Sequence, residues 1–319
     1  MERFREAGRI NRMQFTARRQ KLRDLCAVFL FLFLLPYACS LIFGGEDACR
    51  ETLAVPASEG PMVACDGKAG TLLLPLEEYV EGALAASIPP EYEMETLKAQ
   101  AVILRTLCLK AGETAEVISA ASVGQRYLDA EQRRILWGED YEEKQSRMEE
   151  AVRQTEGLVL TCGGELLEPA YFQLSAGKTR DGKEVLGEGY EYLVSVDCSH
   201  DVEAEDYSQS VVLSEERFRR TLGCGSEGKI LLTRDSADYV LYVDTEAGRM
   251  SGESFRDLFG LSSSCFVLEQ EGDSIRLTSR GIGHGLGFCQ NEADRRAAQG
   301  EDYMELLSDF FKGAKIRKI

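Results

Sequence analysis

Histidine is scarce in this chain, and its cysteines are not paired at metal-binding spacing. Among 319 residues there are two histidines, His200 and His284, and none of the ten cysteines belongs to a Cys-x-x-Cys motif. Structural zinc sites are usually built from such cysteine pairs and histidines. The sequence therefore predicts no metal centre, and we expect no cofactor.

Positive charge is scarce beyond the first 24 residues. The chain has 37 Lys and Arg against 54 Asp and Glu, a net charge of −17. Residues 1–24 carry eight basic and three acidic side chains, which gives this segment a charge of +5. Proteins bind nucleic acids mainly through Lys and Arg on phosphates. We therefore expect no nucleic-acid partner; the acidic remainder suits a neutral ligand or a basic partner.

Charged residues are absent from one long apolar run. Leu25–Phe43 has 19 residues without a charged side chain, about the length that crosses a bilayer core of roughly 30 Å. The basic residues before it predict a cytoplasmic N-terminus and an extracytoplasmic C-terminal part. We predict a basic cytoplasmic segment (1–24), a single-pass anchor in the cell membrane (25–43), a linker (44–70) and a folded domain (71–319). A cleaved signal peptide remains the alternative.

Hydrophobic periodicity within the folded domain predicts a mixture of helices and strands. Helical patterns cover 76–87, 93–110 and 129–155, and two further helices are expected at 292–298 and 303–311. Strand-like segments include two candidate hairpins, one over 158–174 and one over 266–278. Because strands and helices do not alternate regularly, the predicted class is α+β.

A glycine-rich segment surrounds one of the two histidines. Residues 281–290 read GIGHGLGFCQ, with four glycines around His284. Glycine lets the backbone pass close to another group, so the segment suggests a wall where the imidazole faces a bulky ligand. A glycine-rich turn with an incidental histidine is the alternative.

Five segments, taken in order, resemble the SpoIID/LytB domain of stage II sporulation protein D. They are LPLEEYVEG from Leu74, LKAQAV from Leu97 with Arg105-Thr106, AYF from Ala170 with SAGKT, GESFR from Gly252, and GHGLG from Gly283 with Gln290. The resemblance implies mixed helices and antiparallel strands around a glycan cleft. It also implies a lytic transglycosylase of peptidoglycan in sporulation and engulfment. The partners it implies are glycan strands, a sporulation amidase and a polytopic membrane protein.

One departure from the family concerns the proton donor. The family's acid is the glutamate of a Glu-Met-Pro triplet, which falls here on Ser87-Ile88-Pro89. A serine hydroxyl is far too weak an acid to protonate a glycosidic oxygen, whereas general acid catalysis is typically worth about 10²–10⁴-fold. Glu91 and Glu93 follow closely and are the candidate substitutes. In the loop where some members hold zinc, Gly124 replaces the cysteine, so no zinc is expected there.

The remaining family positions are read as glycan-binding. They are polar or aromatic side chains suited to hydroxyl, acetamido or carboxylate groups: Lys98, Gln100, Arg105, Tyr171, Ser175, Lys178, His284 and Gln290. We predict a protein that binds glycan strands with weak or lost transglycosylase activity. The alternatives are an active enzyme with a relocated glutamate and a scaffold for cell-wall hydrolases, so whether the chain is an enzyme stays open.

Overall fold

The computed structural model describes residues 60–67, 70–112, 115, 117–225 and 228–319. The predicted basic segment and anchor lie outside these residues, as does most of the predicted linker. Within the described ranges, no helix has the length and apolar character needed to cross a membrane. Glu59–Ile319 form one compact unit, and its mixed helices and largely antiparallel sheets confirm the α+β prediction.

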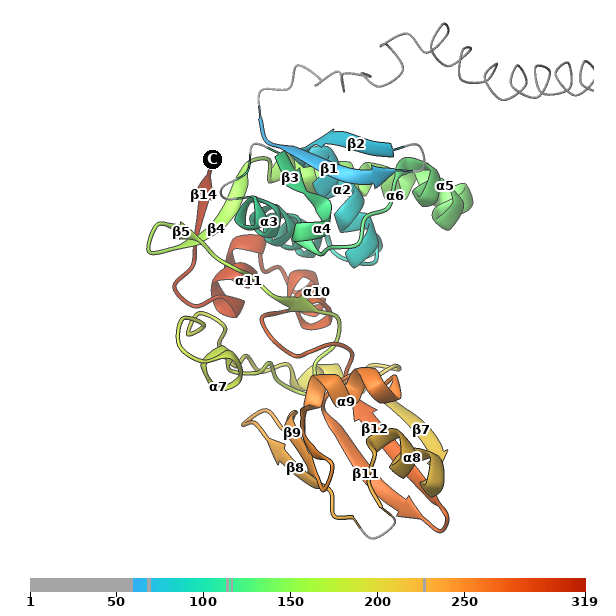
Figure 1. Ribbon diagram of the computed structural model, residues 1–319. Coiled ribbons are helices and arrows are strands. Elements are labelled where there is room, and N and C mark those ends of the chain that lie inside the picture. Colours follow the sequence, from blue (N-terminus) through green and yellow to red (C-terminus); the bar gives the residue numbers. More distant parts are fainter. Residues whose placement is uncertain (1–59, 68–69, 113–114, 116, 226–227) are drawn as a thin grey trace, which may run out of the picture. The chain divides into compact units, whose positions relative to one another are not determined.

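A helical layer around α3 holds the first part of the core (Figure 1). The helix α3 (Met94–Ala111) packs against α2 (Leu76–Ser87) and α6 (Tyr141–Gln154). Pro75 precedes α2, and Pro89 and Pro90 prevent its continuation, as the sequence predicts. Leu97, Ala101, Leu104 and Cys108 are fully buried, so the predicted apolar stripe of α3 faces this core.

A small sheet and short helices adjoin this layer. The sheet has the order β2-β1-β3, with β1 (Met62–Gly67) antiparallel to β2 (Gly70–Pro75) and parallel to β3 (Val117–Ser119). The strand β1 lies in the predicted linker, so the folded domain begins earlier than residue 71. The helix α4 (Ala120–Val123) follows β3. The predicted helix over 129–155 is interrupted at Gly138, which separates α5 (Ala130–Trp137) and the 3-10 turn η2 (Gly138–Asp140) from α6.

The C-terminal end of the chain joins the other side of α3. The helices α10 (Gln290–Ala298) and α11 (Tyr303–Phe310) pack against α3. The strand β14 (Lys315–Lys318) completes a sheet of order β14-β4-β5, with β4 (Leu158–Cys162) and β5 (Glu165–Leu166). The hairpin predicted over 158–174 is therefore formed by β4 and β5 alone. The strand β6 (Tyr171–Phe172) instead pairs in parallel with β13 (Phe288–Cys289).

A second β-rich region has its own aromatic core. Its sheets have the orders β11-β12-β7 and β10-β9-β8. The Phe255 and Phe266 rings stack at 4.6 Å, beside the buried Phe218. The strands are β7 (Ser208–Ser214), β8 (Leu231–Arg234), β9 (Val240–Thr245), β10 (Gly248–Ser251), β11 (Phe266–Glu271) and β12 (Ser274–Arg280), with helices α8 (Glu215–Leu222) and α9 (Gly252–Phe259). The predicted hairpin over 266–278 is thus formed by β11 and β12. The connecting segment contains α7 (Gly182–Leu186) and the 3-10 turn η3 (Ser199–Glu203).

Candidate functional site

Polar side chains from five parts of the fold meet at the C-terminal end of α2. Gln290, the first residue of α10, donates from Nε2 to the carbonyl oxygen of Ser87 at 2.9 Å. The same Nε2 lies 3.3 Å from Oε1 of Gln100 on α3. Ser87 is half-buried, and its hydroxyl donates to the carbonyl of Leu84 at 3.2 Å. The contact between Gln290 and Ser87 closes a sequence gap of 203 residues.

Tyr171 completes this group from β6. Its hydroxyl donates to Oε1 of Gln125 at 2.5 Å, and the Ser87 side chain lies near enough to the phenol to influence its pKa. Burial raises the pKa of Tyr171, so the phenol remains protonated at neutral pH. We call Ser87, Gln100, Gln125, Tyr171 and Gln290 the Ser87 cluster. Its donors and acceptors are amides, hydroxyls and a carbonyl.

The Ser87 cluster combines a buried amide with access to the surface. Among the residues that the structure describes, Nε2 of the fully buried Gln100 has no hydrogen-bond partner. A buried amide without a partner is costly, but its burial keeps this donor out of reach of a ligand at the surface. Gln125 also lines a surface hollow of about 390 Å³ together with Tyr127, Asp129 and Gln132.

The two candidate substitute acids are placed poorly for proton donation. Glu91 is exposed and forms an ion pair with Lys144 at 2.8 Å. The Lys144 ammonium lowers the pKa of Glu91, so this carboxylate holds no proton to donate near neutral pH. Glu93 is exposed at the N-terminus of α3, and its backbone N–H donates to Asp294 Oδ1 at 2.6 Å.

Asp294 is a carboxylic acid near this region that the sequence did not single out. It lies on α10 one helical turn after Gln290, which holds the Ser87 carbonyl. It is half-buried, and burial raises the pKa of its carboxyl group. The i, i+4 spacing from Gln290 is the only sequence signal that could have indicated it. Its contact with Glu93 also gives it a structural role at the start of α3.

The glycines of the His284 segment pack against protein. At Gly287, with φ +74°, an added Cβ would lie 2.2 Å from the carbonyl oxygen of Ala170. At Gly283, with φ +113°, it would lie 2.6 Å from Cβ of Phe172. The glycines therefore allow the segment to lie directly on the strand β6 and its neighbours. Close packing against the protein therefore explains these glycines, and no bulky ligand at the imidazole is needed to explain them.

His284 is held as a neutral ring at this surface. Its Nδ1 accepts a hydrogen bond from the backbone N–H of Leu286 at 3.1 Å, so the neutral ring carries its proton on Nε2. The imidazole centroid lies 5.8 Å from that of Phe172, and the ring lies near the backbone of Tyr171. Burial lowers the pKa of His284. His284 thus lies beside the tyrosine of the Ser87 cluster.

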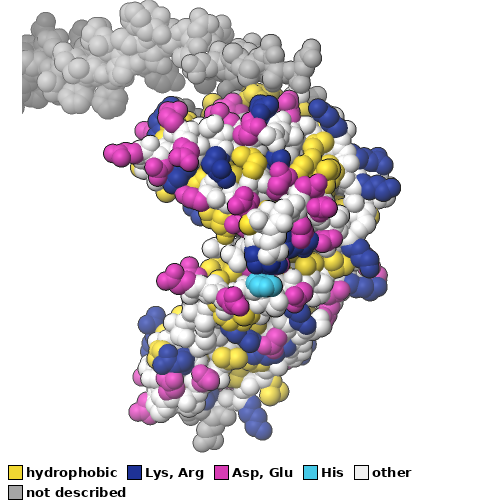
Figure 2. Space-filling model, turned by 180° about the vertical axis from the view of Figure 1, so that it is seen from behind, with side chains coloured by type: hydrophobic (Ala, Val, Ile, Leu, Met, Phe, Trp, Pro, Cys, Tyr) yellow, Lys and Arg dark blue, Asp and Glu magenta, His cyan; other side chains and the backbone are white. Residues whose placement is uncertain are grey.

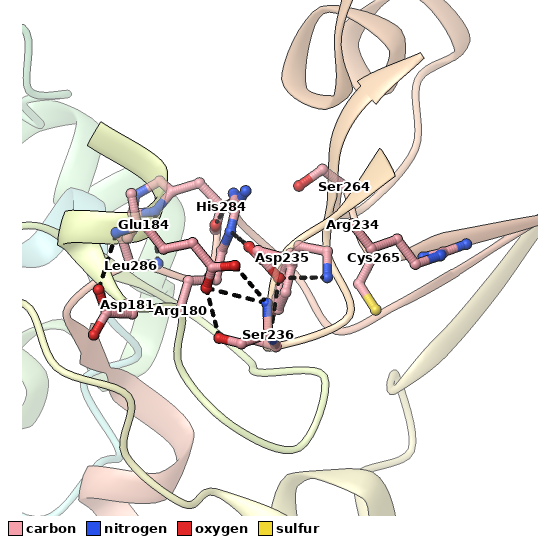
Figure 3. A network of polar contacts seen from close by, with 12 residues as sticks. Arg180, Asp181, Glu184, Arg234, Asp235, Ser236, Ser264, Cys265, His284 and Leu286 are labelled. Atoms are coloured by element: carbon pink, nitrogen blue, oxygen red, sulfur yellow. Dashed lines mark hydrogen bonds and ion pairs between the residues drawn. The ribbon is translucent and has the colours of Figure 1, made fainter. Parts of the chain in front are cut away.

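A buried arginine fixes the His284 segment (Figure 3). Arg180 donates from Nε to Asp235 at 2.6 Å and from Nη1 to the carbonyl of His284 at 3.0 Å. Nη1 also contacts Glu253 at 3.0 Å, and the guanidinium lies 5.0 Å from the centre of the Tyr239 ring. Arg180 and Asp235 are both nearly inaccessible, so this network is part of the frame that positions His284.

The lowered pKa of His284 makes a pH prediction. Because the ordinary value is 6.5, the unfolded chain takes up a proton at higher pH than the folded chain does. The contribution of His284 to the free energy of unfolding is therefore complete above about pH 6.5, and it is lost as the pH falls through the folded-state pKa. We expect His284→Asn to reduce this loss, because its Oδ1 still accepts from Leu286 without titrating. Urea unfolding between about pH 5 and about pH 8 measures the effect. The exposed His200→Asn should retain the wild-type dependence; an unchanged dependence in His284→Asn would contradict this account.

The other predicted ligand contacts lie apart from the Ser87 cluster. Lys98 pairs with Glu95 at 2.5 Å and lies over the Tyr303 ring at 5.6 Å. Lys178 is exposed. Ser175 is fully buried, and its Oγ accepts from the backbone N–H of Gly177 at 3.0 Å.

Arg105 is a core residue in the structure. Its side chain is fully buried and binds Glu77 through Nη2 at 2.6 Å and Nε at 2.8 Å. Burial corrects the expectation that Arg105, Ser175 and Gln100 contact a ligand. Sequence analysis predicts Arg105 as a glycan-binding residue, whereas its partner Glu77 on α2 holds it in the core.

The surface mixes charges of both signs. Figure 2 shows Lys and Arg side chains interspersed with Asp and Glu over one face. On this face, the described residues form no broad basic patch of the kind that nucleic-acid-binding proteins use.

The comparisons with known proteins agree with the resemblance in the sequence. Residues 70–162 match the family model SpoIID, described as stage II sporulation protein. The chain is 28% identical over 255 residues to stage II sporulation protein D of Bacillus subtilis, covering 76% of this chain and 74% of the relative. The values are the same for the protein of that name from Bacillus amyloliquefaciens. An amidase enhancer of Bacillus subtilis is 20% identical, over 74% of this chain and 40% of its own length.

Proposed function

We infer that this chain, which carries a SpoIID domain and is similar to stage II sporulation protein D, binds glycan strands of peptidoglycan at the outer face of the cell membrane and has weak or no lytic transglycosylase activity. The observation that carries this proposal is Ser87. It stands at the position of the family's acid, its polar contacts are with Leu84 and Gln290, and its side chain lies near Tyr171.

The chemistry of transglycosylation explains why the serine matters. The reaction breaks the bond between the anomeric carbon of N-acetylmuramic acid and the glycosidic oxygen, which takes a proton from the acid. The 6-hydroxyl of the same muramic residue then bonds to the anomeric carbon and loses its proton. Ser87 cannot protonate the leaving oxygen near neutral pH, because an aliphatic hydroxyl is far less acidic than a carboxylic acid.

Binding needs less than catalysis, and the Ser87 cluster retains groups suited to it. A phenol can stack its ring on a sugar face and hydrogen bond through its hydroxyl. Gln100 is fully buried, so its amide supports the cluster from within and does not reach a glycan. Tyr171 and Gln125 present the complementary hydroxyl and amide.

Binding is tested by co-sedimentation of the full chain with glycan strands stripped of peptide. We expect Tyr171→Phe to weaken binding about 2- to 10-fold, because a hydrogen bond contributes about 0.5–1.5 kcal/mol. Tyr242→Phe is the matched control, since Tyr242 is exposed on β9, outside the Ser87 cluster. Equal binding by both variants would remove Tyr171 from the glycan site.

An active enzyme with a relocated acid is the second candidate, and Asp294 is now its best-placed donor. Its raised pKa favours the protonated form, unlike that of Glu91. If the wild type releases anhydro-ended fragments, Asp294→Asn should abolish the release, whereas Glu91→Gln and Glu93→Gln should not. If none of these three variants lowers the release, all three acids are excluded as the proton donor.

The similarity to an amidase enhancer supports a third candidate, a scaffold for a sporulation amidase and a polytopic membrane protein. The acidic character of the chain suits a basic partner surface. Reversing the charge of exposed Asp and Glu side chains should then abolish capture of the amidase and leave glycan binding intact. Loss of glycan binding without loss of amidase binding would contradict the scaffold.

A further inference from the structure

Two cysteines and one aspartate converge inside the fold. Cys198, Asp201 and Cys289 are all fully buried. The two sulfur atoms and a carboxylate oxygen lie within 4.8 Å of one another. This is the one such group of metal-ligand side chains in the described ranges, and we call it the Cys–Asp cluster.

The fold brings these residues together from distant places in the sequence. Cys198 and Asp201 belong to one tight turn at η3, where the N–H of Asp201 donates to the carbonyl of Cys198 at 3.0 Å. Cys289 lies on β13, and its Sγ is 3.0 Å from Asp201 Oδ2 although 88 residues separate them. Sequence spacing alone therefore did not indicate this cluster.

Asp201 lacks a positive partner. Its carboxylate accepts from three neutral groups: the N–H of Ser175 at 2.8 Å, the side-chain amide of Asn291 at 2.8 Å, and the thiol of Cys289. No Lys or Arg forms an ion pair with Asp201 among the residues that the structure describes. A buried carboxylate without a cation is costly, so the site favours a bound positive ion.

The donor set selects the kind of ion. Thiolates prefer soft or borderline metals such as zinc over magnesium and calcium, which prefer oxygen ligands. Zinc binds two sulfurs at about 2.3 Å and a carboxylate oxygen at about 2.0–2.2 Å. The spread of the three atoms allows one ion to contact all of them. Carbonyl oxygens of Val196 and Gln173 lie 3.5 Å and 3.9 Å from the sulfurs of Cys198 and Cys289.

We propose that Cys198, Asp201 and Cys289 bind a zinc ion that ties η3 to β13. On binding, the two thiols release their protons to solvent and coordinate as thiolates. The ion takes the place of the Cys289 thiol proton that Asp201 accepts. Because Cys289 directly precedes Gln290, and Asp201 holds the N–H of Ser175, the zinc would stabilise the strands around the Ser87 cluster. This role is structural and does not depend on the proposed glycan binding.

The test measures metal in the purified full-length chain under reducing conditions. We expect one zinc per chain by elemental analysis, and a sulfur-to-metal charge-transfer band when Co²⁺ replaces the zinc. Cys289→Ser and Cys198→Ser should each lose the zinc and the band. Chelation should lower the melting temperature of the wild type and leave that of the two variants unchanged.

Two other cysteines serve as controls. Cys162 is exposed and Cys265 is buried, and neither belongs to the Cys–Asp cluster. Cys162→Ser and Cys265→Ser should retain zinc and the cobalt band. Three results would overturn the proposal: no metal on the reduced wild type after zinc titration, zinc retained in both cluster variants, or a Cys198–Cys289 disulfide in the chain isolated without reductant.

Discussion

Ser87→Glu is expected to raise the release of anhydro-ended glycan fragments about 10²- to 10⁴-fold over the wild type, the range that one general acid supplies. Ser87 is half-buried beside Tyr171, and its neighbours are uncharged amides and hydroxyls. A carboxyl group placed there would be poorly solvated, so its pKa should rise and it would keep a proton to donate. Digestion of purified glycan strands followed by mass spectrometry of the products measures the effect.

Ser87→Gln is the matched control for this gain of activity. Glutamine has the length of glutamate and can hydrogen bond, but it cannot donate an acidic proton. It should therefore bind glycan strands without releasing anhydro-ended fragments. If both variants are inactive while glycan binding persists, position 87 is not the donor's place. If the wild type already cleaves glycan strands efficiently, the serine at position 87 has not removed the transglycosylase activity.

Arg105→Met is expected to destabilise the folded domain by about 3 kcal/mol, the lower part of the range for breaking a buried ion pair. The side chain of Arg105 is fully buried, and its contacts hold α2 to α3 through Glu77 and α3 to β4 through the carbonyl of Leu158 at 3.1 Å. Methionine fills much of the volume but leaves Glu77 without its cation. Because Glu77 is 32% exposed, water reduces the penalty. Urea unfolding of the purified chain measures the loss.

Arg153→Met is the control for this effect. Arg153 is 68% exposed and pairs with Glu150 on the surface of α6, where an ion pair adds little stability. Its unfolding midpoint should stay near that of the wild type. Equal midpoints for Arg105→Met and Arg153→Met would show that the pair with Glu77 does not hold the two helices together.

Local sequence signals predicted much of the helical layer. Pro75 and the Pro89-Pro90 pair placed both ends of α2, and the apolar periodicity after Glu93 placed α3. The strand β1 was missed because six residues within a polar, glycine-containing segment carry too weak a pattern. The parallel pairing of β6 with β13 joins two-residue strands from distant segments. No local pattern reports such a contact.

The sequence indicated which residues belong to the candidate site, but not which contacts they make. The resemblance located Ser87, Tyr171 and Gln290, but the hydrogen bond between Gln290 and the Ser87 carbonyl depends on the packing of α10 against α3. Arg105 was misread because an arginine on a helix is usually solvated, and only Glu77 on a neighbouring helix makes its burial possible. Asp294 was missed because its only sequence signal is the i, i+4 spacing from Gln290, and nothing else distinguishes it from other acidic helix residues.

The most direct test of the central claim uses the wild-type chain on glycan strands stripped of peptide. Co-sedimentation and analysis of released products are measured on the same sample. The account predicts that the chain sediments with the strands and that anhydro-ended fragments stay at the level of a protein-free control. Efficient release of such fragments, or failure of the folded chain to sediment with the strands, would contradict it.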